Sequence, residues 1–424
     1  MPRAHYNFTP NGPLPEIHQH STAKHEVLRS YLSAYFRTLA PSHQQEELKL
    51  TIVDGFAGGG LYTHSLTREI VYGSPFVFLG AAKEADFLLN KDRHKPLRMN
   101  IDFFFIEKDK GAFSLLENTL KHEGYKDRID KDIKLINGSF AEQVKPVTEF
   151  IRKKNPKNGR SIFLLDQYGY TDVPTSLIRN ILKTLPSAEI ILTFNVDSFI
   201  NYASDNPVTK NLLEKAEIPD ALKGRSIDDI KSKEKDFRLY IQSCLHQQLV
   251  QSCGARYYTT FFIRTEGHGV YWLVHLSQHH RARDVMTTVH WSVNNHFIHY
   301  GGPGLDMYHV LGYDPASDSS ISNQLELGFC FDDPAQDRSI AMLMEQIPHH
   351  VFSHDEGISF GELFATTCNS SPADSTRYKQ AIASLAELKE IEIFSPEGNR
   401  RLKSTTIKDG DRLIPSRQLT LLLG

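Results

Sequence analysis

Acidic and polar side chains stand directly after apolar runs at four places in the first half of the chain. The four positions are Asp54, Glu107, Asn137 and Asp166. Each apolar run is typical of a buried strand, and in an open parallel sheet ligands bind outside the carboxyl ends of the strands. Carboxylates at that edge can accept hydrogen bonds from hydroxyl and amine groups. We therefore expect one ligand site, built from successive strand ends.

A glycine-rich segment, Gly55-Phe56-Ala57-Gly58-Gly59-Gly60, follows Asp54. Gly58 and Gly60 allow the backbone to approach a ligand closely and to turn sharply into a helix. A plain strand-to-helix turn is the alternative interpretation. Glu107 favours a ligand, because a carboxylate at the second strand end can accept both hydroxyl hydrogens of a ribose, although it could also be a solvated end paired with a lysine. It lies about 50 residues after the glycines, against about 20 in a dinucleotide fingerprint, which argues against NAD.

The third and fourth strand ends carry groups that could meet a base. Ser139 could contact an adenine edge and Phe140 could stack on its ring, although Asn-Gly-Ser is also ordinary turn chemistry. Asp166 follows four apolar residues, so it is either buried with partners or faces a site. Tyr168 and Tyr170 offer flat surfaces for a base, although tyrosines near a turn more often pack than stack.

Basic residues lie near the start of the first predicted helix. They are His20, Lys24 and His25. Cations there oppose the helix dipole, so a phosphate or another ligand nearby would explain them. A solvent-exposed helix face is the alternative.

Apolar spacing predicts the elements that position these residues. A helix is expected from Ser21 or Thr22 to residue 39, with helices near 111–123, 141–153 and 175–184 and a cap at Ser74. Strands are expected at 48–53, 101–106, 133–136, 161–165 and 189–194. Alternation of strands and helices predicts an α/β, Rossmann-like, mostly parallel sheet. The runs at 257–263 and 270–276 are joined too closely for a parallel crossover, which predicts an antiparallel last strand.

The rest of the chain divides into an insertion, a connection and a tail. Residues 205–250 are charged and helical in pattern, as expected of an insertion within a first domain covering 1–300. Residues 301–350, rich in Gly, Asp, Ser and Pro, are expected to connect with limited structure. Residues 351–424 predict helix, helix and hairpin, which indicates a winged helix-turn-helix.

Composition excludes several classes of protein. The chain has 424 residues, 40% hydrophobic and 23% charged, with a formal charge of -3, so it is neither disordered nor basic throughout. Its 4 cysteines are too widely spaced for a metal or redox motif, and no His or Cys pair predicts a metal. No signal peptide or apolar run long enough for a membrane is present, which predicts a cytoplasmic protein.

The motifs together resemble a class I S-adenosylmethionine-dependent methyltransferase and, more narrowly, the three-Cys-motif partner protein family. More distantly they resemble the J-type 23S rRNA adenine-N6 methyltransferases, which share a Lys-His helix start and a similar glycine loop. The segments that carry the resemblance are 23–28, 53–60, 73–75, 105–109, 165–169 and 271–274 with His279.

The resemblance implies S-adenosylmethionine as cofactor and a role for each matching residue. The methionine part would lie against Asp54, Gly55, Phe56, Gly58 and Gly60, the ribose against Glu107, and the adenine against Ser139 and Phe140. Asp166, with Tyr168 beside it, would orient an amine for methylation. Amino-methyltransferases usually show Asp/Asn-Pro-Pro-aromatic, whereas this chain has Asp166-Gln167-Tyr168-Gly169. That departure affects adenine specificity more than cofactor binding.

Three functions remain open from the sequence. The leading one is a methyltransferase acting on RNA or DNA, supported by nine Lys and Arg against six Asp and Glu in residues 375–424. The second is a non-catalytic binding component that partners a three-cysteine-motif, radical-enzyme-like protein, as the family name implies. A nicotinamide dehydrogenase is the weakest.

Overall fold

The computed structural model describes residues 8, 12–167, 171–194, 196–234, 237–265, 269–293, 297–299, 302–305 and 329–416. It divides into two compact units, Met1–Val289 and His290–Gly424. Tyr168 and Tyr170 lie outside the described residues, and so does the side chain of His20.

A mostly parallel sheet forms the centre of the first unit. Its strands, in the order β9-β10-β8-β7-β2-β5-β6, are β9 (Tyr257–Thr265), β10 (Gly269–Ser277), β8 (Ala188–Phe194), β7 (Ser161–Leu165), β2 (Glu47–Asp54), β5 (Arg98–Glu107) and β6 (Ile133–Asn137). The strands from β8 to β6 pair in parallel. β10 runs antiparallel to both β8 and β9. This confirms the predicted Rossmann-like sheet with its antiparallel last strand.

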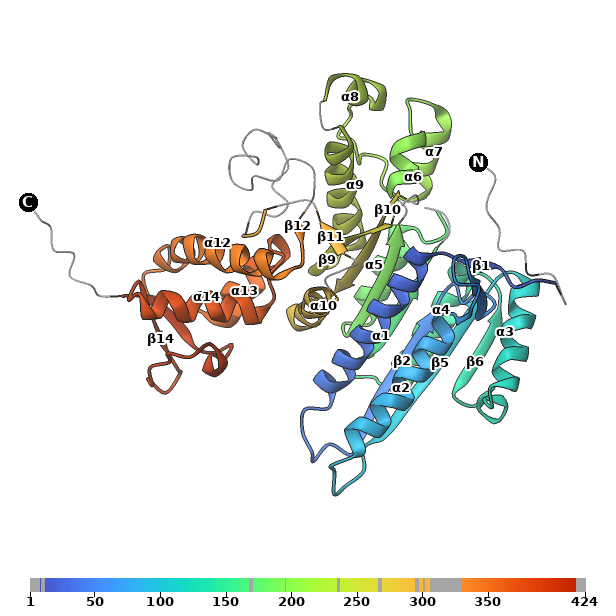
Figure 1. Cartoon of the computed structure of the whole chain (residues 1–424), viewed down its shortest axis with the longest axis horizontal. Coiled ribbons are helices and arrows are strands. Elements are labelled where there is room, and N and C mark those ends of the chain that lie inside the picture. Colours follow the sequence, from blue (N-terminus) through green and yellow to red (C-terminus); the bar gives the residue numbers. More distant parts are fainter. Residues whose placement is uncertain are drawn as a thin grey trace, which may run out of the picture. The chain divides into compact units, whose positions relative to one another are not determined.

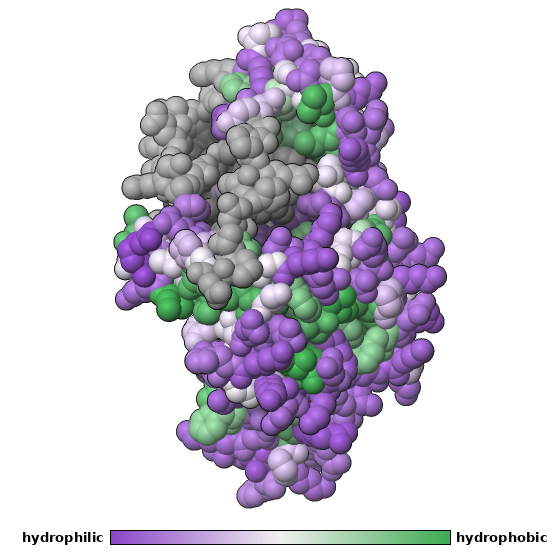
Figure 2. Space-filling model, turned by 90° about the vertical axis from the view of Figure 1, so that its right-hand side faces the viewer, coloured by the Kyte–Doolittle hydropathy of each residue, from purple (hydrophilic) through white to green (hydrophobic). Residues whose placement is uncertain are grey.

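Helices cover both faces of this sheet, as Figure 1 shows. The helices of the first unit are α1 (Gln19–Leu39), α2 (Ser74–Asn90), α3 (Lys110–His122), α4 (Phe140–Lys154), α5 (Thr175–Thr184), α6 (Val196–Tyr202), α7 (Pro207–Lys215), α8 (Ile227–Lys233), α9 (Phe237–Cys253) and α10 (His280–Ser292), which crosses into the second unit. The apolar side chains of β7 and β8 are buried along their whole length. The face seen in Figure 2 is mostly hydrophilic, with small apolar patches. The predicted helices are confirmed, and residues 205–250 contain α7, α8 and most of α9.

Two local expectations for this unit are wrong. Helix α1 begins at Gln19 with His18 as its N-cap, so Ser21 and Thr22 lie inside the helix. Gly73, not Ser74, caps α2, because the Ser74 hydroxyl bonds to a carboxylate.

A small sheet interrupts the expected passage from the glycine segment to α2. It consists of β1 (Glu16–Ile17), β3 (Leu61–His64) and β4 (Ile70–Tyr72). The amide of Gly73 donates to the carbonyl of Gly60 at 2.8 Å, so a hydrogen bond joins the residue before the β3–β4 hairpin to the residue after it. The hairpin was not predicted, because its strands are too short for a clear alternating pattern.

The second unit is a winged helix-turn-helix, as predicted. Its winged-helix elements are α12 (Asp333–Phe352), β13 (Ile358–Ser359), α13 (Phe360–Thr367), α14 (Ser375–Glu387), β14 (Ile391–Phe394) and β15 (Arg412–Pro415). The strands β11 (Phe297–His299) and β12 (Phe329–Cys330), which pair antiparallel with each other, are not part of its sheet. Strand β15 pairs antiparallel with β13 and β14. The second strand of the predicted hairpin therefore begins only at Arg412.

Helix α12 contradicts the expectation of limited structure throughout 301–350. Asp332 caps it by accepting from the amide of Ala335 at 2.8 Å. Ala335, Leu343, Ile347 and Val351 are buried at helical spacing. The Gly- and Pro-rich composition before residue 333 had obscured this periodicity.

Candidate functional site

The glycine segment turns where only glycine fits well. Gly58 has φ +60° and Gly60 has φ +75°, values that other residues rarely adopt. A Cβ on Gly58 would lie 2.2 Å from the Tyr62 hydroxyl, and one on Gly60 would lie 2.9 Å from the Phe76 ring. The loop is therefore packed closely against side chains of its own unit at the carboxyl edge of β2, with Gly58 half-buried and Gly60 buried.

Glu107 joins the end of β5 to this loop. One of its oxygens, Oε2, accepts from the amide of Gly58 at 2.8 Å, and Oε1 accepts from the amide of Asp109 at 2.7 Å. Burial raises the pKa of Glu107, while these amide hydrogen bonds oppose the rise. The structure thus brings together the glycines and Glu107, as the sequence predicted.

Asp54 lies fully buried under the same loop, with 0% of its surface exposed. Oδ1 accepts from the amide of Phe56 at 3.2 Å and Oδ2 from the Ser74 hydroxyl at 2.5 Å. The pKa of Asp54 is raised to about 7, mainly by burial; the hydrogen bonds from Ser74 and Phe56 oppose the rise, and the charges of Asp166 and Glu107 add to it. The three carboxylates therefore influence one another at one edge of the sheet. Among the described residues no Lys, Arg or His forms an ion pair with Asp54.

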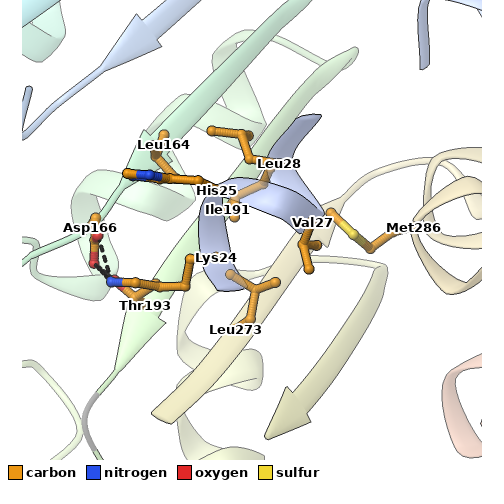
Figure 3. A pocket seen from close by; sticks show the side chains of 10 residues that line it. All are labelled: Lys24, His25, Val27, Leu28, Leu164, Asp166, Ile191, Thr193, Leu273 and Met286. Carbon is orange, nitrogen blue, oxygen red and sulfur yellow. Dashed lines mark hydrogen bonds and ion pairs between the residues drawn. The ribbon is translucent and has the colours of Figure 1, made fainter. Parts of the chain in front are cut away.

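Asp166 follows β7 and is held by two elements. Lys24 of α1 donates to its two oxygens at 2.8 and 2.6 Å, and the Thr193 hydroxyl of β8 donates to Oδ1. Figure 3 shows the Lys24 ammonium directed at this carboxylate. Burial raises the pKa of Asp166, but the charge and hydrogen bonds of Lys24 and the bond from Thr193 lower it more, so the net shift is downward. Asp166 is consequently an ionised acceptor at neutral pH.

Lys24 and His25 do not lie on a solvent-exposed helix face, which was the alternative that the sequence left open. The Lys24 side chain is only 11% exposed, because it turns inward to Asp166. Burial, followed by the charge of Lys24, lowers the pKa of His25 to about 4, so its ring is neutral at pH 7. The buried Nδ1 of His25 has no hydrogen-bond partner among the residues described.

A cavity of about 20 Å³ lies beside these two residues. It is lined by residues of α1, β7, β8, β10 and α10, including Lys24, His25, Asp166 and Thr193. That volume holds one water molecule and not a base ring. The cavity between α1 and the sheet is thus too small for a base, whereas the Asp166 side chain is 34% exposed.

Phe140 does not offer the stacking surface that the sequence suggested. It is only 2% exposed, and its ring packs against Phe56 and Phe163 at centroid distances of 6.3 and 6.4 Å. A Cβ on Gly55 would lie 2.9 Å from this ring, so Gly55 makes room for it. Phe140 is a core residue here, because it opens α4 with its side chain turned under the sheet. Ser139 is the N-cap of α4, and its amide donates to Glu142 at 3.3 Å.

Sequence reasoning missed several polar groups on the face of the sheet beneath α1. Thr193 and Glu189 lie on one face of β8 at alternating positions. Glu189 accepts from the Tyr31 hydroxyl and lies 2.9 Å from Nε2 of His275, and all three side chains are buried. The signal in the sequence was two polar residues four positions apart, and so on one face, within an otherwise apolar strand. These contacts fix α1, and hence Lys24, on the sheet.

Within the described part of the chain, no group of three or more His, Cys, Asp or Glu residues could hold a metal ion. None of the helices described there is long and apolar enough to cross a membrane.

Comparisons with known proteins match each unit separately. A family model described as "GMT-like wHTH domain" matches residues 312–398. No protein of curated function matches the chain.

Three solved structures resemble about three fifths of the chain. WbdD is 9% identical, with 60% of this chain and 40% of WbdD covered and a TM-score of 0.31. This chain therefore spans less than half of the length of WbdD. The O-methyltransferase TomG from Streptomyces achromogenes, solved with SAM, is 13% identical over 62% of this chain and 90% of its own, with a TM-score of 0.30. Cofactor-bound Rv0187 from MTB is 12% identical over 61% and 90%, with a TM-score of 0.28.

Proposed function

We propose that the first unit is an S-adenosylmethionine-dependent methyltransferase acting on nucleic acid, at an exocyclic base amine. The observation that carries the proposal is the convergence of Asp54, Glu107 and Asp166 around the glycine loop at the carboxyl edge of the sheet. This edge is where open α/β sheets bind ligands.

The buried carboxylate of Asp54 fits the cofactor. An ionised carboxylate without a cationic partner is unfavourable in a buried position, and its pKa of about 7 reflects this. The ammonium group of S-adenosylmethionine would supply the missing charge. Glu107 would hold the ribose hydroxyls, and the backbone at Gly58 and Gly60 would lie along the methionine part.

Asp166 and Lys24 would then act on the amine to be methylated. When bound, the cofactor supplies an electrophilic methyl group on a sulfonium. Asp166 accepts hydrogen bonds from the amine and aligns its lone pair, because transfer of a methyl group depends mainly on alignment. Its lowered pKa makes it a weak base, so the proton released by the amine passes on to water. Lys24 keeps the carboxylate ionised, and the amine replaces Lys24 as a hydrogen-bond donor to Asp166 when it binds.

A second candidate is a non-catalytic binding component. Lys24 donates to both oxygens of Asp166, which is the arrangement of a closed structural ion pair. The lack of prolines after Asp166 agrees with it. In that case the second unit would recruit a partner, such as the three-cysteine-motif protein implied by the sequence resemblance.

Methyl transfer from labelled S-adenosylmethionine to RNA and to DNA tests the proposal. The full chain is expected to label one polymer, and Asp166→Asn is expected to lower transfer at least 100-fold while calorimetry shows unchanged cofactor affinity, since only the orienting acceptor is lost. Lys91→Gln, on an exposed residue, is the matched control. Tight cofactor binding without transfer to either polymer would support the second candidate.

A further inference from the structure

A long basic loop joins β14 to β15 in the second unit. Between Glu397 and Asp409 it carries the four cations Arg400, Arg401, Lys403 and Lys408 against those two carboxylates. Apart from Ile407, its residues from 396 to 410 are exposed or half-buried. The segment matched by the winged-helix family model ends at residue 398, so these cations belong to a part of the loop outside that match. We call residues 396–410 the wing loop.

One arginine anchors the wing loop, and the other cations face solvent. Arg401 lies 3.5 Å from Asp411, whose side chain is 0% exposed. Arg400 is 48% exposed and 3.4 Å from Glu392, a surface ion pair of small energetic effect. Lys403 and Lys408 are exposed. The loop therefore holds three cations outward on a fixed base.

Helix α14, in contrast, presents little free positive charge. Its two cations are Arg377 and Lys379. Arg377 is paired with Asp374 at 3.0 Å and lies over the Trp291 ring at 3.6 Å from its centroid. Lys379 lies 5.1 Å from the centroid of the Phe360 ring. These intramolecular contacts make α14 a poor electrostatic partner for a polyanion.

We propose that the wing loop, and not α14, is the surface with which this chain holds a nucleic-acid phosphate backbone. Arg400, Lys403 and Lys408 would each contact a phosphate, and Figure 1 shows the loop after β14 extending away from the helices of its own unit. Leu402 lies among these cations in the sequence and is 53% exposed. Exposure to water is unfavourable for this apolar side chain. The inference deepens the proposed function, because it names how the polymer would be held.

Salt-dependent binding of the full chain tests this inference. The probes are a mixed-sequence DNA duplex of about 20 base pairs and an RNA hairpin of similar length, followed by fluorescence anisotropy. Each phosphate contact contributes about 0.9 to the slope of log K against log salt for duplex DNA. The triple variant Arg400→Gln, Lys403→Gln, Lys408→Gln should therefore reduce the slope by about 2.7. Between 50 and 200 mM salt the unmodified chain should lose about 40-fold more affinity than this variant.

The control variant removes three exposed lysines of the first unit, Lys83→Gln, Lys91→Gln and Lys131→Gln. Its slope should equal that of the unmodified chain. Equal slopes for the wing variant and the control, or no binding of either probe by the unmodified chain, would overturn the inference and favour an acidic protein as the partner. A slope change with only one probe identifies that polymer. Methyl transfer is scored separately: wing-dependent binding without transfer would refute the enzyme and leave the wing loop assignment intact.

Discussion

Replacing Asp54 by Asn should change how the stability of the protein depends on pH. Burial raises the pKa of Asp54 from 3.8 to about 7. Between these values the folded chain keeps a proton that the unfolded chain has released, so the free energy of unfolding falls as pH rises and levels off above pH 7. At about 1.4 kcal/mol per pKa unit, the effect reaches about 4 kcal/mol at pH 8. Asn removes the charge and keeps an oxygen that can accept from the amide of Phe56.

Urea unfolding of the two proteins between pH 4 and 8 measures this effect, because the contributions of other groups cancel in the difference. Asp54→Asn should become progressively more stable than the unmodified chain as pH rises, by up to about 4 kcal/mol. Asp127→Asn, an exposed carboxylate, is the control. A stability difference that is the same at pH 5 and pH 8 would refute the reasoning that Asp54 is buried with a raised pKa.

Calorimetry extends the same variant to the proposed cofactor. If the ionised carboxylate receives the ammonium group, affinity for S-adenosylmethionine in the unmodified chain should fall about tenfold for each pH unit below 7. The Asn variant should bind more weakly at pH 8 and lose that pH dependence. Equal affinity of the two proteins at pH 8 would separate Asp54 from cofactor binding without affecting the stability result.

Three further substitutions test other parts of the site. Gly60→Ala should reduce the free energy of unfolding by about 1–2 kcal/mol, because an L side chain is strained at φ +75° and its Cβ meets neighbouring side chains; urea unfolding that matches the unmodified chain would contradict this. Lys24→Met should raise the pKa of Asp166, so that the pH profile of methyl transfer loses activity at low pH, whereas an unshifted profile would show that Lys24 does not set the ionisation of Asp166. Glu189→Ala should destabilise the fold by about 1–3 kcal/mol, since it removes the carboxylate that accepts from the buried Tyr31 hydroxyl and lies 2.9 Å from Nε2 of the buried His275; a free energy of unfolding within 0.5 kcal/mol of the unmodified value, as expected of a surface substitution, would contradict that.

Much of the fold could be predicted, because its strands end in residues that contrast sharply with the apolar runs before them. Glu107 and Asp166 each follow a buried strand, and this contrast locates both the strand and the edge at which the residue lies. Only a short connection separates β9 from β10 in the sequence, and this similarly predicted that β10 is antiparallel. In these cases local pattern and global topology agree.

The remaining parts depend on contacts between segments far apart in sequence. Lys24 and Asp166 are 142 residues apart, and neither residue type reveals that they form a pair. Phe140 was assigned to a ligand because it follows a strand end, but the direction of its side chain is set by how α4 packs. The period of the α12 residues was masked by the composition of the segment before it. Residue type thus located the site, whereas packing decided which groups are available in it.

The hairpin between Gly60 and Gly73 shows how this loop can tolerate change. The hairpin begins after Gly60 and ends before Gly73, and a 2.8 Å hydrogen bond joins these two glycines. The length of the hairpin therefore does not affect the position at which Ser74 contacts Asp54. Its tip, with Leu66 76% exposed, touches little of the core. We expect this hairpin to tolerate substitutions, an inserted peptide or a reporter tag at its tip, since the hydrogen bond between the two glycines would hold its ends in place.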